Sequence, residues 1–551
     1  MEFTSVNKIF EASFKKHWDR PAISNYQGVT LHYRDVARRI EELHTMFEEC
    51  GLQKGDKVAL CSRNQANWAV AFLSTMTYGA VPVPLLHEFK SSNIHHLVNH
   101  SEAKILFVDD VIWEGLTETE MPDLHAIIQV NTFKLLYAAD EKITEAREHL
   151  NELFGRKYPN VFTPDALDYY EDSAEELAII NYTSGTSGFS KGVMIPYRAI
   201  LSNLEFGRKV LPELDHTKNM VSMLPSAHMY GLMFELLYEL SVGAHVHFLS
   251  RVPSPKIIMQ AMSDVKPYLV IAVPLVIEKI YKSKVKPILE KEGIRFLMKV
   301  PGLNQVVMNK IKTELVNAFG GEFYQVIIGG AAFNKEVEAF FKKIGFPVTV
   351  GYGMTECAPI ITYDDWNVEK LYSCGKAAPN LEVRIDSTDP ANVPGEILIK
   401  GANVFLGYFK NEEATKSVFT DDGWFKTGDM GVIDQDGSLF IKGRSKCMIL
   451  GPSGQNIYPE EVEAVINSQP YVVDSLVVED NGGLTALIYP DFAQGAKDGM
   501  DQDAFVKYME GTLPELNKEL PNYAKLKKIE VMSEDFERTP KKSIKRYLYQ
   551  R

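Results

Sequence analysis

The sequence predicts an α/β protein with a large N-terminal α/β domain, with stacked sheets plus a β-subdomain, and a small α+β C-terminal domain. The chain has 551 residues, more than one hydrophobic core usually supports, so at least two domains are expected. Helix-like and strand-like segments alternate over residues 31–110, which favours parallel sheets with ligands at the carboxyl ends of strands. From Gly395 onward, short β segments separated by Gly and Asp turns replace this alternation.

The first elements follow from the spacing of apolar residues. Residues 33–50 show helical spacing, and the strand KVALCS follows the turn GLQKGD. A helix over residues 67–78 precedes the strand-like AVPVPL, and residues 95–110 repeat the helix-turn-strand order. Residues 118–176 are polar and helix-rich, which indicates an elaboration on the scaffold.

The last elements form a mixed α/β segment after Pro459. The sequence predicts a helix over residues 460–468, β segments at DSLVVED and LTALIYP, and a charged helix near Phe505. We therefore expect domains of residues 1–444 and 445–551.

Composition excludes several classes of protein. Hydrophobic residues make up 45% and charged residues 24%, as in ordinary globular proteins, and the five cysteines form no CxxC pair. The most apolar run, residues 268–277, is far shorter than the ~20 residues that span a bilayer. The net charge of −14 disfavours nucleic acid as a partner. These features predict a cytoplasmic protein without a transmembrane segment, disulfide framework or zinc cluster.

A loop rich in Gly, Ser and Thr follows the apolar strand LAIIN and is expected to connect a strand to a helix. Its glycines allow close approach of an anion, its hydroxyl and amide groups donate to phosphate oxygens, and Lys191 offsets charge. A flexible linker is the alternative, but the preceding buried strand disfavours it. The candidate phosphate-binding residues are Thr183, Ser184, Gly185, Thr186, Ser187, Gly188 and Lys191.

Further motifs follow in a fixed order. With the loop at 182–192, they are LPSAHMYG at 224–231, GGAA at 329–332, GYGMTE at 351–356, TGD at 427–429 and GRSK at 443–446. Together they resemble the adenylate-forming superfamily of acyl-CoA synthetases, luciferases and peptide-synthetase adenylation domains. The resemblance covers most of residues 30–546. It implies that ATP and Mg²⁺ activate a carboxylic acid as its acyl-adenylate.

The resemblance also assigns roles to single residues. Glu356 and the Thr183 hydroxyl would contact Mg²⁺, and Thr355 would contact the α-phosphate. Asp429 and Arg444 would hold the ribose hydroxyls; for Asp429 taken alone, a turn residue in TGDMG is the less favoured alternative. The adenine would lie against Tyr352 and Gly353 and the backbone of Gly330, Ala331 and Ala332.

Two further roles concern gating and rotation. His228 lies in an apolar context, where a lone histidine more often packs or caps a helix than performs catalysis. By resemblance we assign His228 a gating role over the acyl pocket. The small domain would be mobile, with Lys446 at the hinge.

The basic C-terminal segment, residues 538–551, departs from the family pattern. The family places a catalytic lysine in a TPxGKIxR-like segment, whereas residues 539–546 read TPKKSIKR. Aligned through Thr-Pro and Ile-x-Arg, the lysine position holds Ser543, which lacks a positive charge. Lys542 or Lys545 would have to replace it, and we nominate Lys542.

The segment after His228 limits the choice of acid substrate, and the domain content limits the choice of acyl acceptor. The segment MYGLMFELLYEL is largely apolar, and its one nearby acid, Glu235, is expected to face away from a substrate ammonium. The helical segment over residues 282–320 resembles long-chain fatty acyl-CoA synthetases, so we expect a medium- to long-chain fatty acid. No carrier domain is seen, which favours coenzyme A as acceptor. Loading of an acyl carrier protein, a non-catalytic nucleotide- or acyl-adenylate-binding role, peripheral membrane contact and a homodimer stay open.

Overall fold

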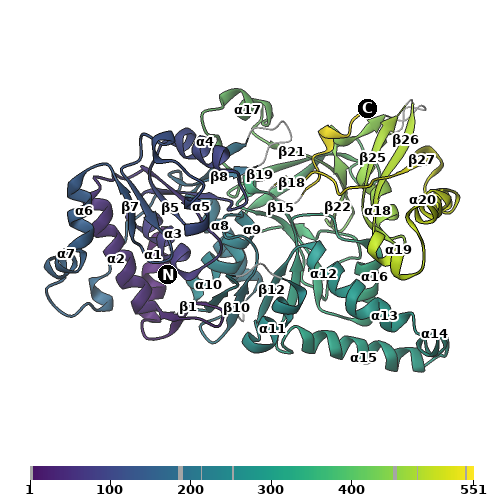
Figure 1. The fold of residues 1–551 in the computed structure, drawn as a ribbon, viewed down its shortest axis with the longest axis horizontal. Coiled ribbons are helices and arrows are strands. Elements are labelled where there is room, and N and C mark those ends of the chain that lie inside the picture. The colour runs from purple at the N-terminus through teal and green to yellow at the C-terminus, as the bar shows by residue number, and fades with distance from the viewer. Residues whose placement is uncertain are drawn as a thin grey trace.

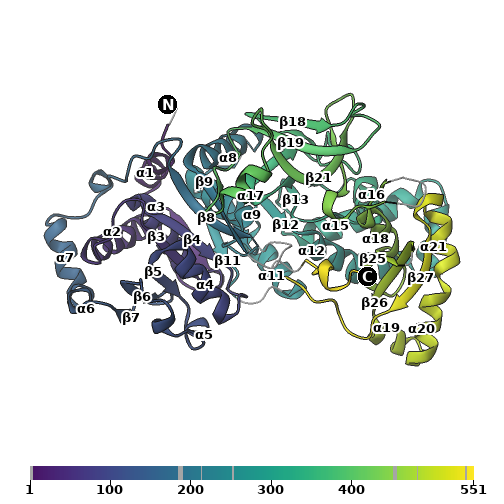
Figure 2. The ribbon, with the colours of Figure 1, turned by 90° about the horizontal axis from the view of Figure 1, so that it is seen from above.

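The computed structural model describes residues 4–183, 190–211, 214–250, 254–450, 456–480, 482–539 and 543–551. Five predicted phosphate-binding residues, 184–188, and Lys542 lie outside these ranges. Figure 2 shows β25–β27 and α18–α21, all from the C-terminal part, gathered at one end of the molecule, with α6 and α7 at the other. The predicted fold class, a large N-terminal α/β part and a small C-terminal part, is confirmed.

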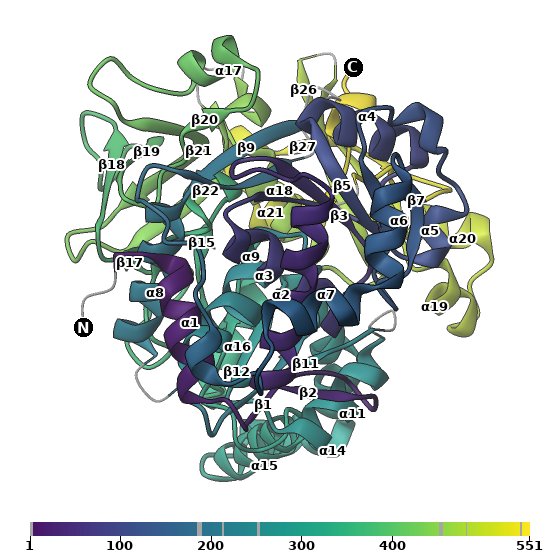
Figure 3. The ribbon, with the colours of Figure 1, turned by 90° about the vertical axis from the view of Figure 1, so that its left-hand side faces the viewer.

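The first sheet contains the alternation predicted near the N-terminus. Its strands run parallel except for the last pair, which is antiparallel. Helix α3 (Ala66–Tyr78) is apolar on nearly every side because it is buried among α2, β1, β3 and β4. Helices α2 and α7 lie side by side against this part of the molecule (Figure 3). The sheet order is β4 (Val81–Leu85), β3 (Lys57–Cys61), β5 (Ala103–Val108), β6 (Ala126–Gln129) and β7 (Leu135–Ala138).

The polar segment over residues 118–176 is only partly helical. It contains the predicted helices, α6 (Glu141–Glu148) and α7 (Leu150–Lys157), but also β6 and β7, which extend the first sheet. These strands are four residues each, too short for their apolar alternation to stand out from the polar surroundings.

The second sheet is larger and carries the candidate site at one edge. All neighbouring strands are parallel except β1 and β2. The carboxyl ends of β13 and β14 therefore meet at the same edge, followed by the GGAA and GYGMTE motifs. The order is β14 (Val348–Val350), β13 (Gln325–Ile328), β12 (Leu269–Ala272), β10 (Asn219–Ser222), β11 (His245–Phe248), β1 (Pro21–Asn25) and β2 (Thr30–His32).

The segment around the Gly-rich loop corrects one prediction. The loop joins two antiparallel strands, with Thr183 opposite Lys191 in the register, and not a strand to a helix. The short apolar run KGVMIP forms the second strand before helix α8 (Tyr197–Val210) begins. The sheet order is β20 (Gly407–Tyr408), β9 (Lys191–Pro196) and β8 (Leu177–Thr183).

The β-subdomain follows the second sheet along the chain. One of its sheets is antiparallel throughout and ends at Arg444. The four-stranded order is β18 (Leu381–Asp386), β19 (Gly395–Gly401), β21 (Phe425–Ile433) and β22 (Leu439–Arg444), and the three-stranded order is β15 (Tyr352–Gly353), β16 (Ile360–Tyr363) and β17 (Lys376–Ala377).

The C-terminal part has an apolar core of its own, which includes Ile466, Ala486 and Phe505. The Arg546 guanidinium pairs with the buried carboxylate of Glu463 on α18, with 2.8 Å between Nη1 and Oε1, and so attaches the C-terminal segment to this part. Its strands are β23 (Ile449–Leu450), β24 (Asn456–Ile457), β25 (Val472–Asp480), β26 (Gly483–Pro490) and β27 (Leu526–Val531). Its helices are α18 (Pro459–Asn467), α19 (Phe492–Lys497), α20 (Gln502–Gly511) and α21 (Leu513–Glu519).

The remaining helices cover the sheets, and within the described ranges none of the molecule's helices is long and apolar enough to cross a membrane. All five cysteines are free thiols. The other α-helices are α1 (Val6–Lys16), α2 (Tyr33–Glu49), α4 (Ser91–Ser101), α5 (Asp110–Trp113), α9 (Met229–Leu232), α10 (Tyr238–Val242), α11 (Pro255–Val265), α12 (Pro274–Ile280), α13 (Lys286–Leu289), α14 (Glu292–Lys299), α15 (Leu303–Ala318), α16 (Lys335–Ile344) and α17 (Glu412–Ser417).

Glu239 on α10 makes stability depend on pH. Its side chain is fully buried, neither carboxyl oxygen accepts a hydrogen bond from another described residue, and burial raises the pKa of Glu239 to about 8. Folding raises this pKa, so protonated Glu239 is favoured in the folded state. The contribution of Glu239 to the free energy of unfolding is complete below about pH 4.5. It is lost as the pH rises to about 8, at up to ~1.4 kcal/mol per pH unit.

We expect Glu239→Met to flatten this dependence. Urea unfolding at pH 5, 7 and 8.5 should show a variant whose advantage over the wild type grows with pH, because methionine carries no charge to bury. Glu338 and Glu369, whose pKa values burial raises to about 7 and about 8, are present in both proteins and cancel in the difference. If the difference in unfolding free energy between the variant and the wild type does not change with pH, the pKa of Glu239 is not raised on folding.

Candidate active site

A cluster of contacts joins the two predicted ribose-binding residues to the predicted adenine-stacking tyrosine. Asp429 on β21 lies opposite Arg444 on β22, with 3.1 Å between Arg444 Nε and Asp429 Oδ1. The Tyr352 hydroxyl donates to the other carboxylate oxygen at 2.7 Å. The cluster therefore presents a carboxylate, a guanidinium and an aromatic ring in fixed relation.

The charges of this cluster are well defined. Asp429 raises the pKa of Arg444, and burial, followed by Asp429, raises the pKa of Tyr352 well above its ordinary value. Arg444 therefore stays cationic and Tyr352 keeps its proton as a donor. The Arg444 side chain is 57% exposed while that of Asp429 is 9% exposed, so donor groups of the guanidinium reach solvent. Such a pair suits a vicinal diol, which both donates and accepts hydrogen bonds.

A second group of contacts links Glu356 to the Gly-rich loop. The Tyr408 hydroxyl donates to Glu356 Oε1 at 3.0 Å, and the Lys191 ammonium lies 4.6 Å from the centre of the Tyr408 ring. Thr183, opposite Lys191 in the register, places its hydroxyl 3.5 Å from the Lys191 carbonyl oxygen. A carboxylate, a lysine and a hydroxyl thus lie along one line of contacts.

The loop that carries Glu356 is held by close backbone packing. Glu356 and Thr355 lie in a 3-10 turn, η5 (Thr355–Cys357), and both are buried. A Cβ at Gly353 would lie 2.2 Å from the Pro359 carbonyl oxygen, so only glycine fits there. This packing fixes Glu356 relative to Tyr352.

The GGAA segment lies at the adjacent strand end. The Gly351 amide donates to the Ile328 carbonyl at 2.9 Å, which holds this segment beside the GYGMTE loop. Gly330 has φ of 86°, a conformation that favours glycine. Gly330, Ala331 and Ala332 are exposed, which leaves their backbone accessible to a ligand.

His228 caps a helix in this structure. It is half-buried at the N-terminus of α9, and its Nδ1 accepts from the Tyr230 amide at 3.3 Å. The Tyr230 ring lies against Gly329, and its hydroxyl donates to the Ile327 carbonyl at 3.0 Å. His228 is thereby connected to the GGAA segment, while its gating role stays a prediction.

Glu235 is committed to the backbone. It lies in a π-helical turn, η3 (Met233–Leu237), and is fully buried. Oε2 accepts from the Leu224 amide and the Ser222 hydroxyl, both at 3.0 Å. Burial raises the pKa of Glu235 well above its ordinary value.

The hinge and tail residues lie beyond β22. Lys446 is exposed and lies in a 3-10 turn, η6 (Ser445–Cys447), that begins directly after Arg444. Ser543 is exposed, and its carbonyl accepts from the Thr539 amide at 2.8 Å. The Lys545 ammonium lies 3.1 Å from a Glu537 carboxylate oxygen.

The sequence motifs missed two residues of this site. Tyr408 connects Glu356 with Lys191, and Tyr230 connects His228 with Gly329. The only sequence signal for Tyr408 is a Gly-Tyr pair on a short apolar run, which is common in proteins. Tyr230 lies inside the LPSAHMYG motif but has no distinguishing spacing.

The family now follows from the comparisons. Residues 10–409 match the AMP-binding enzyme family, and residues 448–551 match the AMP-binding enzyme C-terminal domain. This chain belongs to the AMP-binding enzyme family. It is an adenylate-forming enzyme of the AMP-forming acid–thiol ligase type.

Several characterised proteins resemble this AMP-binding enzyme. The long-chain-fatty-acid–CoA ligase FadD15 of Mycobacterium bovis is 26% identical over 84% of this chain and 78% of its own length. A long-chain-fatty-acid–CoA ligase of Escherichia coli is 26% identical over 86% of this chain and 83% of its own length. ATP-bound MatB from Rhodopseudomonas palustris superposes with a TM-score of 0.77 at 24% identity, over 99% of this chain and 98% of its own.

The candidate metal ligands of this AMP-binding enzyme suit Mg²⁺ bound together with a nucleotide. The described residues contain no group of three or more His, Cys, Asp or Glu side chains that could hold a metal alone. Mg²⁺ usually takes one or two carboxylates plus substrate phosphates and water, so one carboxylate, Glu356, with the Thr183 hydroxyl fits that chemistry. O-succinylbenzoate–CoA synthetase from Bacillus subtilis, solved with ATP and a magnesium ion, superposes with a TM-score of 0.74 at 21% identity, over 98% of each chain.

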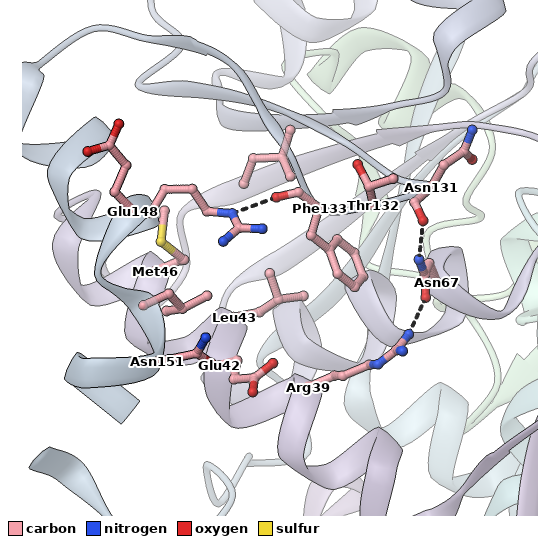
Figure 4. A pocket seen from close by; sticks show the side chains of 13 residues that line it. Arg39, Glu42, Leu43, Met46, Asn67, Asn131, Thr132, Phe133, Glu148 and Asn151 are labelled. Carbon is pink, nitrogen blue, oxygen red and sulfur yellow. Dashed lines mark hydrogen bonds between the residues drawn. The ribbon is translucent and has the colours of Figure 1, made fainter. Parts of the chain in front are cut away.

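A separate cavity of about 330 Å³ is lined by residues of α2, α6 and α7 and the turn between β6 and β7 (Figure 4). Arg39 donates to Asn67 Oδ1 at 2.7 Å at its edge. None of the predicted site residues that the structure describes lines this cavity.

Proposed function

We propose that this enzyme activates a medium- to long-chain fatty acid with ATP and then transfers the acyl group to coenzyme A. In the first half-reaction a carboxylate oxygen of the acid forms a bond to the α-phosphorus as pyrophosphate leaves. In the second, the thiol loses its proton to solvent, its sulfur bonds to the acyl carbonyl carbon, and the bond between that carbon and the phosphate oxygen of AMP breaks, so that AMP leaves. The observation that carries the proposal is that the GYGMTE loop, through Tyr352 and Glu356, takes part in two groups of contacts: Tyr352–Asp429–Arg444 and Glu356–Tyr408–Lys191.

Each part of the proposed nucleotide site has a distinct role. Asp429 and Arg444 bind the ribose, Tyr352 and Gly353 lie under the adenine, and the backbone of residues 330–332 lines its edge. The loop over residues 183–188 and Lys191 receives the phosphates. Thr355 contacts the α-phosphate. Glu356 and Thr183 would hold Mg²⁺, which offsets phosphate charge when bound.

Two observations support a fatty acid over an amino acid. Both carboxyl oxygens of Glu235 are occupied by backbone amides and Ser222, so this acid is not available to pair with a substrate ammonium. The curated relatives described above are named for long-chain fatty acids. The solved relatives also include an anthranilate–CoA ligase, superposed with a TM-score of 0.77 at 19% identity over 99% of this chain and 96% of its own.

The second half-reaction requires the small domain to move. We place the domains at residues 1–444 and 445–551, with the hinge at Lys446, because η6 follows directly on β22. We assign the missing lysine to Lys542, since the Lys545 ammonium is paired with Glu537. His228 gates the acyl pocket from the N-terminus of α9.

Exchange of labelled pyrophosphate into ATP tests the proposal. We expect exchange that depends on the added acid, rising from acetate to palmitate, and acyl-CoA formation when coenzyme A is supplied. Exchange followed by transfer only to an acyl carrier protein would assign the enzyme to carrier loading. Nucleotide binding without exchange for any acid in the series would assign a non-catalytic role.

A further inference from the structure

The helical segment after the site carries an exposed apolar stripe. Phe296 on α14 is 68% exposed, and on α15 Leu303 and Val306 are 44% and 64% exposed. Leu303, Val306 and Lys310 follow helical spacing and share one face. The adjoining face of α15 packs into the core through Val307 and Ile311, so the exposed stripe lies beside the core-facing side of this helix.

The same segment is strongly basic in an acidic protein. Residues 282–312 contain eight cations and two acids, Glu290 and Glu292, whereas the whole chain has a net charge of −14. Among the described residues, no carboxylate oxygen lies within 4.0 Å of any of the eight cationic groups. The cations are Lys282, Lys284, Lys286, Lys291, Arg295, Lys299, Lys310 and Lys312.

Their position favours a flat partner. Figure 1 shows α15 along the lower edge of the molecule with α14 at its end, so the stripe lies on an outward, projecting surface. An apolar stripe flanked by cations that form no ion pair with a described residue matches a surface with an apolar interior and negatively charged groups at its boundary. A bilayer that contains anionic lipids has both properties, whereas a folded acidic protein would need a complementary groove.

The segment is also connected to the site. Helix α12 begins directly after Val273, which lies against Gly330 of the GGAA segment, and the chain continues through η4 (Tyr281–Val285) and α13 into α14. We propose that the α14–α15 stripe, formed by Phe296, Leu303 and Val306 with the flanking cations, docks the enzyme on anionic membrane surfaces. The inference rests on the proposed function, because fatty acids partition into bilayers.

Co-sedimentation of the full-length protein with vesicles tests the docking surface, without ATP or fatty acid. We expect binding to phosphatidylcholine vesicles that contain 30 mol % phosphatidylglycerol, little binding to pure phosphatidylcholine, and release in 0.5 M NaCl because salt screens the attraction. Each cation near an anionic membrane strengthens binding about fivefold. Replacing Lys291, Arg295, Lys299 and Lys310 by Gln should therefore weaken binding by about 100-fold or more.

The apolar contribution has its own variant and control. Phe296→Ser with Val306→Ser should weaken vesicle binding by about tenfold or more, since these side chains would enter the lipid boundary. Val161→Ser with Val393→Ser, at exposed valines elsewhere, should bind like the wild type. Thermal unfolding shows whether all variants fold. Release from vesicles by salt is measured on the wild-type protein and therefore does not depend on any variant.

Three outcomes would overturn the docking surface. These are equal binding to neutral and anionic vesicles, unchanged binding in both stripe variants, and stripe-dependent binding to an acidic acyl carrier protein instead of vesicles. Failure of pyrophosphate exchange with intact vesicle binding would reject the ligase proposal alone. Failure of vesicle binding with intact exchange would reject the docking surface alone.

Discussion

Replacing Glu356 with glutamine should lower acid-dependent pyrophosphate exchange by about 1000-fold, equal to about 4 kcal/mol of transition-state stabilisation. Glutamine keeps the size and can still accept from Tyr408, but it loses the negative charge that Mg²⁺ binding requires. The loss should therefore appear mainly in kcat, with the fold intact. Initial rates over a range of Mg²⁺ concentrations measure it.

A matched control separates charge from general damage at this site. Glu413 lies on the surface of α17, and Glu413→Gln should exchange like the wild type. Tyr408→Phe should cost much less than Glu356→Gln, because it removes a hydrogen bond and leaves the carboxylate. A Glu356→Gln variant within tenfold of wild type would exclude Glu356 as a metal ligand.

Replacing Lys542 with alanine should lower the first half-reaction by about 1000-fold and leave thioester formation from a preformed acyl-adenylate nearly unchanged. The positive charge is needed only while the carboxylate and α-phosphate meet, where additional negative charge develops. Pyrophosphate exchange measures the first half-reaction, and acyl-CoA formation from synthetic acyl-adenylate measures the second.

Neighbouring lysines provide the comparison. Lys541→Ala and Lys545→Ala should keep most of the exchange activity, and for Lys545 the reason is its ion pair with Glu537. Ser543→Lys restores a lysine at the family position and should rescue Lys542→Ala. Equal activity of all three alanine variants would reject the assignment of a replacement lysine.

Much of the fold could be predicted because local pattern and tertiary structure agree. The apolar spacing that predicts a helix over residues 67–78 corresponds to α3, and the β segments after Gly395 correspond to β19, β21 and β22. The loop after β8 was placed wrongly because KGVMIP is short, and only its pairing partner β8 identifies it as a strand. Pairing between strands is not encoded in local periodicity.

The candidate site was predictable by motif but not by geometry. Motifs point to Tyr352, Asp429 and Arg444, yet the hydrogen bond and ion pair that join them span 77 and 15 positions of the chain and arise only on folding. Tyr408 illustrates the limit, since its importance comes entirely from Glu356 and Lys191 beside it. A residue that acts through its neighbours leaves little signal in its own surroundings.

The Asp429–Arg444 pair lies on adjacent strands of one sheet, just before the turn that holds Lys446. A rotation about Lys446 would turn the C-terminal domain while both residues stay with the large domain. The contacts of Asp429 and Arg444 with the nucleotide would then persist through both half-reactions. The ribose contacts of the acyl-adenylate would therefore not have to break when the small domain turns.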